Sequence, residues 1–326
     1  MRKMKQWILS LAAGAVGALG LTATPSLSQP WPQRTVHLIL PLGAGGMPDA
    51  AARLFAERLA EHWKQPVIVE NRPGADGLIG VTAFINLRGD HAMLFSISGP
   101  ITTLPLVHEK SPYDPARDLV PIASAADSFV AIAASASSNI GSLEELVTRA
   151  RVQPGKLNYY AGAGALPYLF AGFFKSAGLD LVLVPYRESS PALSDLGEGR
   201  LHVAVSSMAS LRAPADTGKV RYLAVTNKTR APIAPAVPTA AEAGYPELAY
   251  DGLLGLFGSR DISTERRDRI AADLRVIAAE PAVANRLAAL GMVARFSGPA
   301  EYSASLAKER AKMETIVKSI GHKAGQ

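Results

Sequence analysis

An apolar run that ends in a glycine loop and leads directly into a helical pattern is the feature that most constrains this chain. Residues 38–42 are apolar, the loop 43–46 contains three glycines, and apolar residues then recur every four positions from Ala51 to Leu59. The first N–H groups of such a helix lack intrahelical partners and carry partial positive charge, and glycine lets a ligand approach the backbone. The junction therefore favours an anion-binding site, with an ordinary strand-to-helix turn as the alternative.

The N-terminal residues are typical of a secretory signal peptide. Three basic residues precede the apolar stretch 7–21, and small residues follow at 26–28. We predict a signal peptide over residues 1–28, a mature chain from Gln29 and a periplasmic location. The apolar stretch is shorter than the roughly 20 residues that span a membrane. The sequence contains no cysteine, which excludes disulfides, thiolate nucleophiles and cysteine metal ligands.

Composition and motifs argue against a nucleic-acid surface and against an enzyme. The formal net charge is +6, the basic residues are scattered, and aromatic residues make up 6% of the chain. The six histidines have no metal-ligand spacing. The chain lacks a Gly-x-Ser-x-Gly elbow and a P-loop, and its glycine loop lacks the last glycine of a dinucleotide fingerprint. We therefore predict no catalytic residue, no metal and no cofactor, and an exported α/β enzyme is the less favoured alternative.

Short β-branched runs alternate with helical patterns, which predicts an α/β fold with mostly parallel sheets flanked by helices. The expected strands are 36–41, 67–70, 92–96, 157–161, 181–184, 201–205 and 220–225. The expected helices are 49–64, 142–152, 168–177 and 191–196. Ser142 and Glu145 form a capping box at the start of the second helix. Roughly the last sixty residues fit a nearly all-helical segment, with Ser297 as the N-cap of the final helix.

Small-residue loops follow three of the expected strands. They are the glycine loop 43–46 and the segments 96–100 and 161–164. Open α/β sheets bind ligands beyond the carboxyl ends of their strands. We therefore expect the three loops to converge on one pocket between two lobes, which close over a ligand as in periplasmic binding proteins.

A series of motifs carries a family resemblance over the whole mature length. The segments are 31–32, 40–49 (LPLGAGGMPD), 69–77 (VENRPGADG) with Gly80, 113–115, 118–119, 121–122, 154–159, 184–187, Ala192 with 195–196, 218–221, 223–226 and 237–239. In order and spacing they resemble the Bug-type extracytoplasmic solute receptors of tripartite tricarboxylate transporters. The resemblance implies a two-lobed Venus-flytrap fold. Its first lobe would hold residues 29–127 and 250–326, its second lobe residues 128–249, with crossings near Asp127 and Tyr250.

The resemblance also implies a function. Such receptors capture a small organic anion and present it to a membrane permease. We therefore expect a mono- or dicarboxylate ligand, aromatic acids included, and transporter permease subunits as partners of a monomeric receptor. The glycine-loop amides would receive one carboxylate, often through ordered water, and the second lobe would close on the other end of the ligand. The predicted ligand-binding residues are Leu42, Gly43, Ala44, Gly45, Gly46, Asp49, Ser98, Gly99, Ala161, Gly162, Ala163, Gly164, Ala165, Tyr168 and Ser206.

Three of these positions depart from the family pattern. Ala165 and Tyr168 stand where relatives usually carry a threonine and a histidine, and Ser206 stands where relatives often carry an aspartate that meets an amino group. A plain aliphatic or aromatic carboxylate is therefore expected over a zwitterionic amino acid. Asp49 is expected to be mainly structural, and Arg187 is a candidate partner for a distal carboxylate. The alternatives are a Tyr168 side chain that blocks the pocket, and a receptor that signals to a partner protein instead of feeding transport.

Overall fold

The structure is a computed structural model that describes residues 31–87, 89–186 and 188–321. The predicted signal peptide over 1–28 and the candidate residue Arg187 lie outside the described residues. By its internal contacts the chain divides into Met1–Gln33 and Arg34–Gln326, and every element named below belongs to the second unit.

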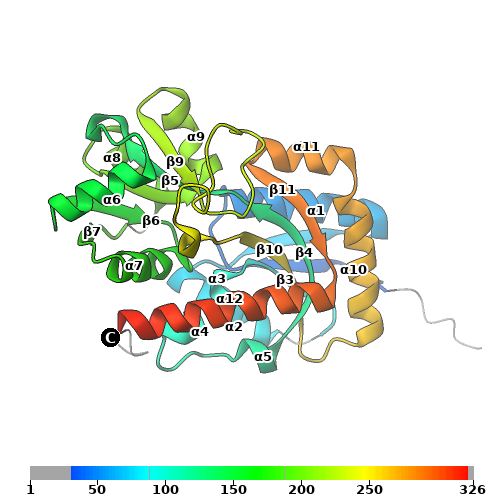
Figure 1. The fold of residues 1–326 in the computed structure, drawn as a ribbon. Helices are drawn as coiled ribbons and strands as arrows, with labels where there is room; N and C mark the ends of the chain where they lie inside the picture. The colour runs from blue at the N-terminus through cyan, green and yellow to red at the C-terminus, as the bar shows by residue number, and fades with distance from the viewer. Residues whose placement is uncertain (1–30, 88, 187, 322–326) are drawn as a thin grey trace, which may run out of the picture. The chain divides into compact units, whose positions relative to one another are not determined.

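Residues Arg34–Gln326 form two mixed sheets flanked by helices, which makes a two-lobed α/β fold (Figure 1). The six-stranded sheet has the order β11 (Met292–Ser297), β4 (Leu119–Ser128), β10 (Gly252–Ser259), β3 (Ala92–Ile97), β1 (Val36–Leu40) and β2 (Val67–Asn71). The five-stranded sheet has the order β7 (Leu181–Leu183), β6 (Leu157–Ala161), β8 (Val203–Ser207), β5 (Val130–Ser135) and β9 (Val220–Val225). The predicted α/β fold is confirmed.

Both sheets are mixed, so the predicted mostly parallel arrangement holds for only part of each sheet. β1 is parallel to β2 and β3, and β6 is parallel to β7 and β8. In contrast, β10 is antiparallel to β3 and β4, β11 is antiparallel to β4, and β5 is antiparallel to β8 and β9. The antiparallel pairs include the strands that lead the chain out of one sheet and into the other. β4 leaves the first sheet at Ser128, β5 enters the second at Val130, and β10 returns beside β4.

Helices cover both faces of the six-stranded sheet. They are α1 (Met47–Trp63), α2 (Leu78–Asn86), α3 (Gly99–Thr102), α4 (Leu104–Val107), α5 (Pro115–Asp118), α10 (Thr264–Ala278), α11 (Pro281–Ala289), α12 (Pro299–Ile320) and the 3₁₀ turn η1 (Ala75–Gly77). On one face Leu94 joins a core cluster with residues of α2 and α12. On the other face the ring centroid of Phe95 lies 6.0 Å from that of Phe55 on α1. Successive side chains of β3 therefore point into different helical layers.

The five-stranded sheet is covered in the same way. Its helices are α6 (Leu143–Val152), α7 (Leu166–Ser176), α8 (Ser189–Gly197) and α9 (Met208–Asp216), with the 3₁₀ turns η2 (Ala136–Ser138) and η3 (Pro246–Leu248). One core cluster joins the sheet to α6 and α7, and another joins it to α8 and α9. Ser142 caps α6 by accepting a hydrogen bond from the Glu145 N–H at 3.1 Å, as the capping motif predicts.

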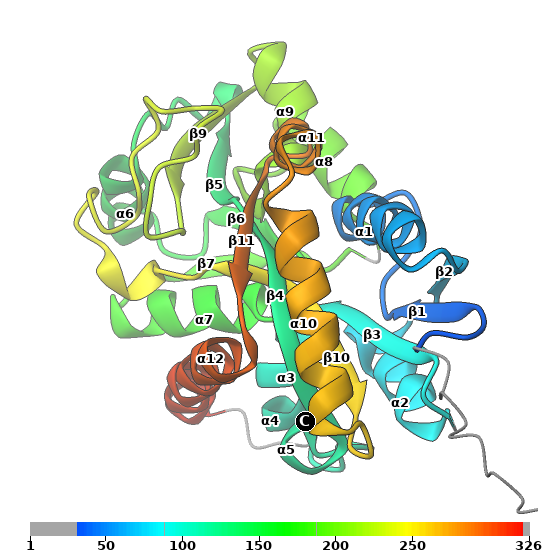
Figure 2. The same cartoon turned by 90° about the vertical axis from the view of Figure 1, so that its right-hand side faces the viewer.

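The C-terminal helix α12 contacts elements of both sheets (Figures 1 and 2). Tyr302 and Leu306 belong to the core cluster of the six-stranded sheet, whereas Met313, further along the helix, belongs to a cluster of the five-stranded sheet. Where α12 packs against α7, a Cβ atom on Gly172 of α7 would lie 2.5 Å from the Ile316 side chain of α12. The helices therefore pack closely because α7 carries a glycine there.

The strands β4, β5, β10 and β11 were not predicted from the sequence, and the predicted start of α12 was wrong. Ser297 is the last residue of β11, and Gly298 is the N-cap of α12. The Ser297 N–H donates to the Ser124 hydroxyl oxygen at 2.8 Å, which fixes Ser297 to β4. The roughly sixty C-terminal residues are therefore not nearly all helical, because β11 interrupts them.

Candidate functional site

The glycine loop joins β1 to α1 and is open to solvent. β1 ends at Leu40, α1 begins at Met47, and residues 43–46 are exposed. Gly45 has a φ of +81°, a left-handed conformation that glycine adopts without strain. A Cβ atom on Gly43 or Gly45 would have no neighbour within 4 Å. The loop therefore leaves open space beside its backbone, next to the N-terminus of a 17-residue helix.

The Asp49 carboxylate supports the glycine loop from the protein side. The residue is only 4% exposed. One carboxylate oxygen accepts hydrogen bonds from the Gly45 N–H at 2.9 Å and from Arg53 Nε at 3.0 Å. The other oxygen accepts from Asn71 Nδ2 at 2.9 Å, and the same amide group donates to the Leu42 carbonyl at 3.2 Å. Both oxygens of Asp49 therefore hold the protein's own groups.

The hydrogen bonds at Asp49 keep it ionised. Burial by itself would raise the pKa of the Asp49 carboxyl, but hydrogen bonds from Arg53, Gly45 and Asn71 outweigh it, and the pKa lies below its ordinary value. The ionised carboxylate also stabilises the positive end of α1. The sequence analysis did not list Arg53 or Asn71. The four-residue spacing of Asp49 and Arg53 on one helix could have indicated the contact between them.

A second predicted loop, Ser98 with Gly99, contacts the loop after β6. The Ser98 side chain is buried, and its hydroxyl oxygen lies 3.2 Å from the Tyr250 hydroxyl. A Cβ atom on Gly99 would lie 3.0 Å from the Ala165 nitrogen and 3.0 Å from the Gly164 Cα. Both neighbours are backbone atoms, so a larger residue at this position requires the two loops to move apart.

The third predicted loop, 161–165, joins β6 to α7 and is buried except at Ala163. The Gly162 N–H donates to the Val205 carbonyl of β8 at 2.8 Å. A Cβ atom on Gly162 would lie 3.7 Å from the Ser206 hydroxyl oxygen. Ser206 therefore lies beside the loop after β6.

Tyr168 occupies the first turn of α7 and packs against the core clusters of both sheets. Burial raises the pKa of its hydroxyl, and the charge of Asp76 raises it further. Asp76 acts in the same direction on the pKa of Tyr160, again after burial. Asp76 lies in η1 with a φ of +53°. The charge of Asp76 thus acts on both tyrosines, and neither Asp76 nor Tyr160 is among the site residues predicted from the sequence.

The loops of the six-stranded sheet are linked to one another through η1. A Cβ atom on Gly77 would lie 2.9 Å from Cγ of Pro100 in α3 and 3.4 Å from the carbonyl oxygen of Pro41, just before the glycine loop. Gly99 therefore packs directly against Gly164, and Gly77 packs between α3 and the start of the glycine loop. Residues 43–46 are exposed to solvent, and the Gly45 N–H among them is bonded to Asp49.

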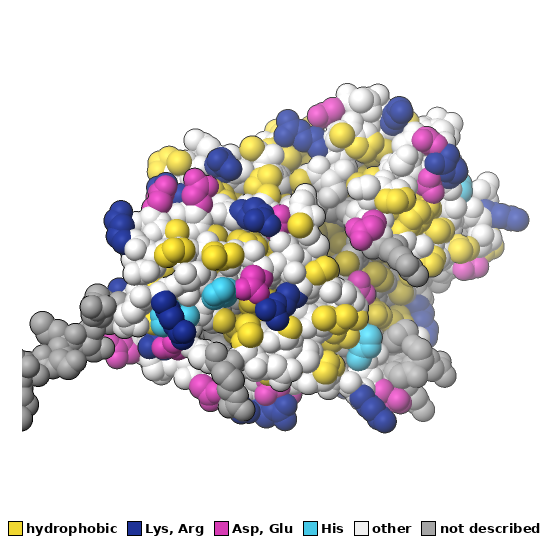
Figure 3. All heavy atoms as spheres, turned by 180° about the vertical axis from the view of Figure 1, so that it is seen from behind, with side chains coloured by type: hydrophobic (Ala, Val, Ile, Leu, Met, Phe, Trp, Pro, Cys, Tyr) yellow, Lys and Arg dark blue, Asp and Glu magenta, His cyan; other side chains and the backbone are white. Residues whose placement is uncertain are grey.

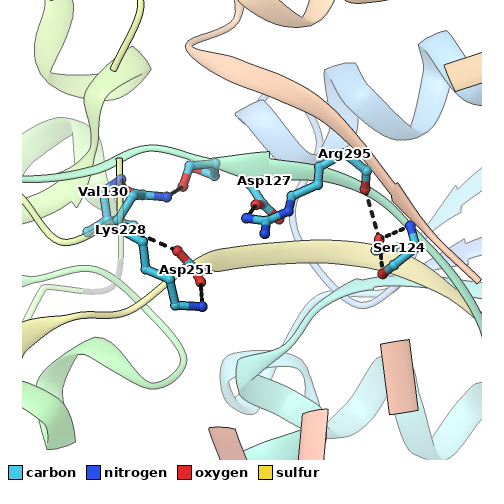
Figure 4. Close-up of polar contacts among 9 residues, drawn as sticks. Ser124, Asp127, Val130, Lys228, Asp251 and Arg295 are labelled. Carbon is cyan, nitrogen blue, oxygen red and sulfur yellow. Dashed lines mark hydrogen bonds and ion pairs between the residues drawn. The ribbon is translucent and has the colours of Figure 1, made fainter. Parts of the chain in front are cut away.

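Polar contacts connect the two crossings between the sheets (Figure 4). The Asn227 side chain donates to the Ser128 carbonyl at 2.9 Å and accepts from the Val130 N–H at 3.0 Å. Lys228 Nζ lies 2.7 Å from Asp251 Oδ2. The outgoing and returning strands are therefore held together by side chains of residues on the return path.

A buried acid lies at the end of the outgoing strand. Asp127 is 2% exposed, and one of its oxygens accepts from Arg295 Nη1 at 2.8 Å (Figure 4). Burial raises the pKa of the Asp127 carboxyl, and the hydrogen bond from Arg295 opposes that rise. This pair joins β4 to β11 where the chain leaves the six-stranded sheet.

A cavity of about 290 Å³ lies away from the predicted loops, between the segment after β9 and α11 with β11. Its lining includes Phe129, Ile233 and Met292, and it contains no ionisable side chain. An apolar lining offers little to hold a carboxylate. We therefore assign the candidate ligand site to the three loops and not to this cavity.

Neither the face shown in Figure 3 nor the search for metal ligands among the described residues indicates another chemistry. On the face shown in Figure 3, basic and acidic side chains are interspersed over the described residues. The described part of the chain holds no group of three or more His, Asp or Glu side chains suited to a metal ion. Within residues 31–87, 89–186 and 188–321, no helix has the length and apolar character needed to cross a membrane.

A family model supports the resemblance seen in the motifs. The model described as "Tripartite tricarboxylate transporter family receptor" matches residues 51–322. The chain belongs to this receptor family. It is 33% identical over 282 residues to a Pseudomonas protein encoded in the tcbD-tcbE intergenic region, with 84% of each chain covered. It is 27% identical over 305 residues to BugT of Bordetella pertussis, with 92% of this chain and 94% of the relative covered.

Solved structures with the same fold support the assignment of this chain to the receptor family. The adipate-bound R. palustris protein has a TM-score of 0.82 and 28% identity, with 89% of this chain and 98% of that chain covered. MatC from Rhodopseudomonas palustris with bound malate has a TM-score of 0.77 and 25% identity, covering 88% and 99%. The periplasmic binding protein BugD has a TM-score of 0.78 and 25% identity, covering 90% and 99%. The family and these neighbours are solute-binding receptors and not enzymes.

Proposed function

We propose that this receptor binds a small organic carboxylate between its two lobes and presents it to the permease subunits of a tripartite tricarboxylate transporter. The observation that carries the proposal is the solvent-open loop 43–46, whose conformation is fixed from inside by Asp49. Backbone amides next to a helix N-terminus favour an anion, directly or through bridging water. Because Asp49 is already bonded to protein groups, among them the Gly45 N–H, the other amides of the loop and not this side chain would receive the carboxylate.

The other end of the ligand would meet the loops that approach each other across the sheets. We propose contacts from Ser98 and Gly99 on one side and from residues 161–165, Tyr168 and Ser206 on the other. The contact between Gly99 and Gly164 supports this arrangement, because it brings the two loops to van der Waals distance. A ligand that bridges them would favour the closed arrangement of the lobes.

The proposal includes the domain organisation and the export of the protein. Residues 29–127 with 250–326 would form one lobe and residues 128–249 the other, which agrees with the change of sheet between Ser128 and Val130. A cleaved signal peptide over 1–28 would deliver a monomer to the periplasm. The periplasmic receptors among its relatives support that location.

Ligand selectivity would follow from the residues around the second loop. Neighbouring structures carry adipate and malate, both dicarboxylates. Ala165 and Ser206 bring no charge to the loop after β6, and Tyr168 adds an aromatic surface. We therefore propose a plain aliphatic or aromatic acid over an amino acid, because an ammonium group would lack a carboxylate among these three residues.

The proposal is tested by the melting temperature of the mature protein, unfolded and refolded to remove carried-over ligand. The panel contains mono-, di- and tricarboxylates, aromatic acids and amino acids. Binding to the native state raises the free energy of unfolding by about 2.7 kcal/mol at a ligand concentration of 100 Kd. We expect a saturable rise with one class of acid. Equal melting temperatures with every acid in the panel would contradict the carboxylate assignment.

A charge placed on the glycine loop provides the matched variant. Gly43→Asp introduces a carboxylate where a Cβ atom has open space, so the fold should tolerate it while a bound anion is repelled. Gly298→Asp is the control, because that glycine also has open space around it and lies at the N-cap of α12. We expect the ligand-induced rise to disappear in Gly43→Asp and to persist in Gly298→Asp. Equal rises in both variants would place the carboxylate elsewhere.

A further inference from the structure

The C-terminal helix contributes a partly buried carboxyl group to the back of the candidate site. Glu309 of α12 accepts a hydrogen bond from the Thr102 hydroxyl at 2.6 Å, and the Ser98 hydroxyl lowers the pKa of its carboxyl. The Ser98 hydroxyl lies 3.2 Å from that of Tyr250, on the return path between the sheets. The Glu309 carboxyl group thus holds Thr102 at the end of the segment 98–102, which carries Gly99 at the contact between the two sheets.

We propose that Glu309 is a positioning residue for the segment 98–102 and that it makes anion binding depend on pH. The inference rests on the proposed function, because it needs an anionic ligand at this segment. An ionised Glu309 competes for the hydroxyl hydrogen of Ser98 and repels a ligand carboxylate at Gly99. A protonated Glu309 does neither. Ligand binding therefore favours the protonated form and takes up a proton.

The surroundings of Glu309 place this proton exchange in the physiological range. Burial raises the pKa of its carboxyl to about 7, against the opposing hydrogen bonds from Thr102 and Ser98. Asp251 on the return path raises the pKa further, and Lys312, one turn along α12, lowers it. The pKa of Lys312 is itself lowered by burial, and its ammonium group donates to the carbonyls of Glu247 and Ala249.

Among the described residues, Asp251 and Lys312 are the charged groups whose effect on the pKa of this carboxyl is resolved. Helices α3 and α4 contribute none, since their sequences are GPIT and LPLV. Burial holds the pKa of Tyr250 and Tyr302 well above the ordinary value, so both stay neutral. Other ionisable groups lie on elements that pack against α12. They include Tyr168 on α7, Asp127 on β4 and Arg295 on β11, and the last two are bonded to each other.

The first test uses the ligand-free protein. The Glu309 carboxyl is titrated by ¹³C NMR in protein with labelled glutamate, and the Glu309→Gln variant identifies its signal. We expect a titration midpoint near pH 7. The same pH steps should shift the backbone amide signals of residues 98–102 in the wild type and leave them unchanged in Glu309→Gln. A midpoint near the ordinary value for glutamate, or unchanged amide signals, would overturn the proposal whatever the ligand is.

The second test measures binding with adipate and malate as probes, by calorimetry at pH 6, 7 and 8. We expect the wild type to bind about threefold to tenfold more tightly at pH 6 than at pH 8, since one proton changes an affinity by at most tenfold per pH unit. Repeating the pH 7 titration in two buffers of different ionisation enthalpy should reveal proton uptake. The Glu309→Gln variant should bind with nearly the same affinity at all three pH values.

The control is Glu314→Gln on the same helix, where the carboxyl is exposed and bonded to Lys318. It should keep the wild-type pH dependence. If wild type and Glu309→Gln share one pH profile, or if affinity rises with pH, the role of Glu309 is wrong while carboxylate binding stands. If neither probe nor any acid of the panel binds the wild type, the proposed function fails, and the NMR titration still decides whether Glu309 controls residues 98–102.

Discussion

The glycine loop after β1 and the loop after β6 occupy equivalent positions on their sheets but are built in opposite ways. Residues 43–46 are exposed, and the ionised, hydrogen-bonded carboxylate of Asp49 holds them in place. Residues 161–165 are mostly buried and contain no ionisable side chain; they are held by packing against Gly99 and by the bond from Gly162 to β8. The difference suggests a division of work, in which the first loop recognises the anion and the second closes over it.

The largest expected effect is a loss of stability when the side chain that supports the first loop is removed, a change that leaves the second loop intact. Asp49→Ala leaves the Gly45 N–H, Arg53 and Asn71 without their shared acceptor. We expect a loss of about 2–4 kcal/mol in the free energy of unfolding, measured by urea denaturation, because a buried hydrogen-bonded charge is removed. Asp216→Ala is the control, since that side chain is 69% exposed, and it should change the free energy by less than about 0.5 kcal/mol. Similar losses in the two variants would show that Asp49 does not support the loop.

A smaller effect is expected when the contact between the second loop and Gly99 is overfilled. Gly99→Val places side-chain atoms against the backbone of Gly164 and Ala165, so the loops must separate. We expect a loss of about 1–3 kcal/mol in stability and a weaker affinity for the carboxylate, measured by denaturation and calorimetry. Gly298→Ala, which meets no atom within 4 Å, serves as the control. Unchanged affinity in Gly99→Val would mean that the contact plays no part in closure.

The smallest effect is a difference in the acid sensitivity of the two loops. The pKa of Asp49 is lower in the folded protein than in the unfolded chain, so its contribution to stability is present above the unfolded value near 4 and is lost as pH falls through the folded value. We expect amide hydrogen exchange at Gly45, whose N–H donates to Asp49, to accelerate between pH 5 and pH 3, relative to Gly162, whose N–H donates to Val205, and after correction for intrinsic rates. Equal acceleration in both loops would argue against distinct means of support.

The placement of the candidate loops could be anticipated because its signals are local in sequence. The strand ends at Leu40 and Ala161 and the glycines after them follow from apolar runs and turn chemistry, and the structure puts loops at both places. The capping of α6 by Ser142 was equally local. The strands β4, β5 and β10 were missed because they are rich in alanine or glycine and lack the β-branched runs that mark buried strands.

The remaining features depend on residues that are far apart in the chain. Thr102 and Glu309 are separated by 207 positions, and Ser98 and Tyr250 by 152, so no local pattern indicates either contact. Antiparallel pairing beside β4 likewise depends on where β10 returns. Ser297 fits an N-cap by its residue type, but its hydrogen bonds to Ser124, 173 residues away, place it in a strand.

The central claim, that the glycine-loop amides receive the carboxylate, is tested most directly by NMR. The backbone amide signals of the mature protein are followed while adipate is added, with adipamide, its uncharged diamide, as the control ligand. The account predicts saturable shifts at residues 43–46, together with shifts at 162–165 as the lobes close, and no comparable shifts with adipamide. Saturable binding of adipate that leaves residues 43–46 unshifted would contradict it.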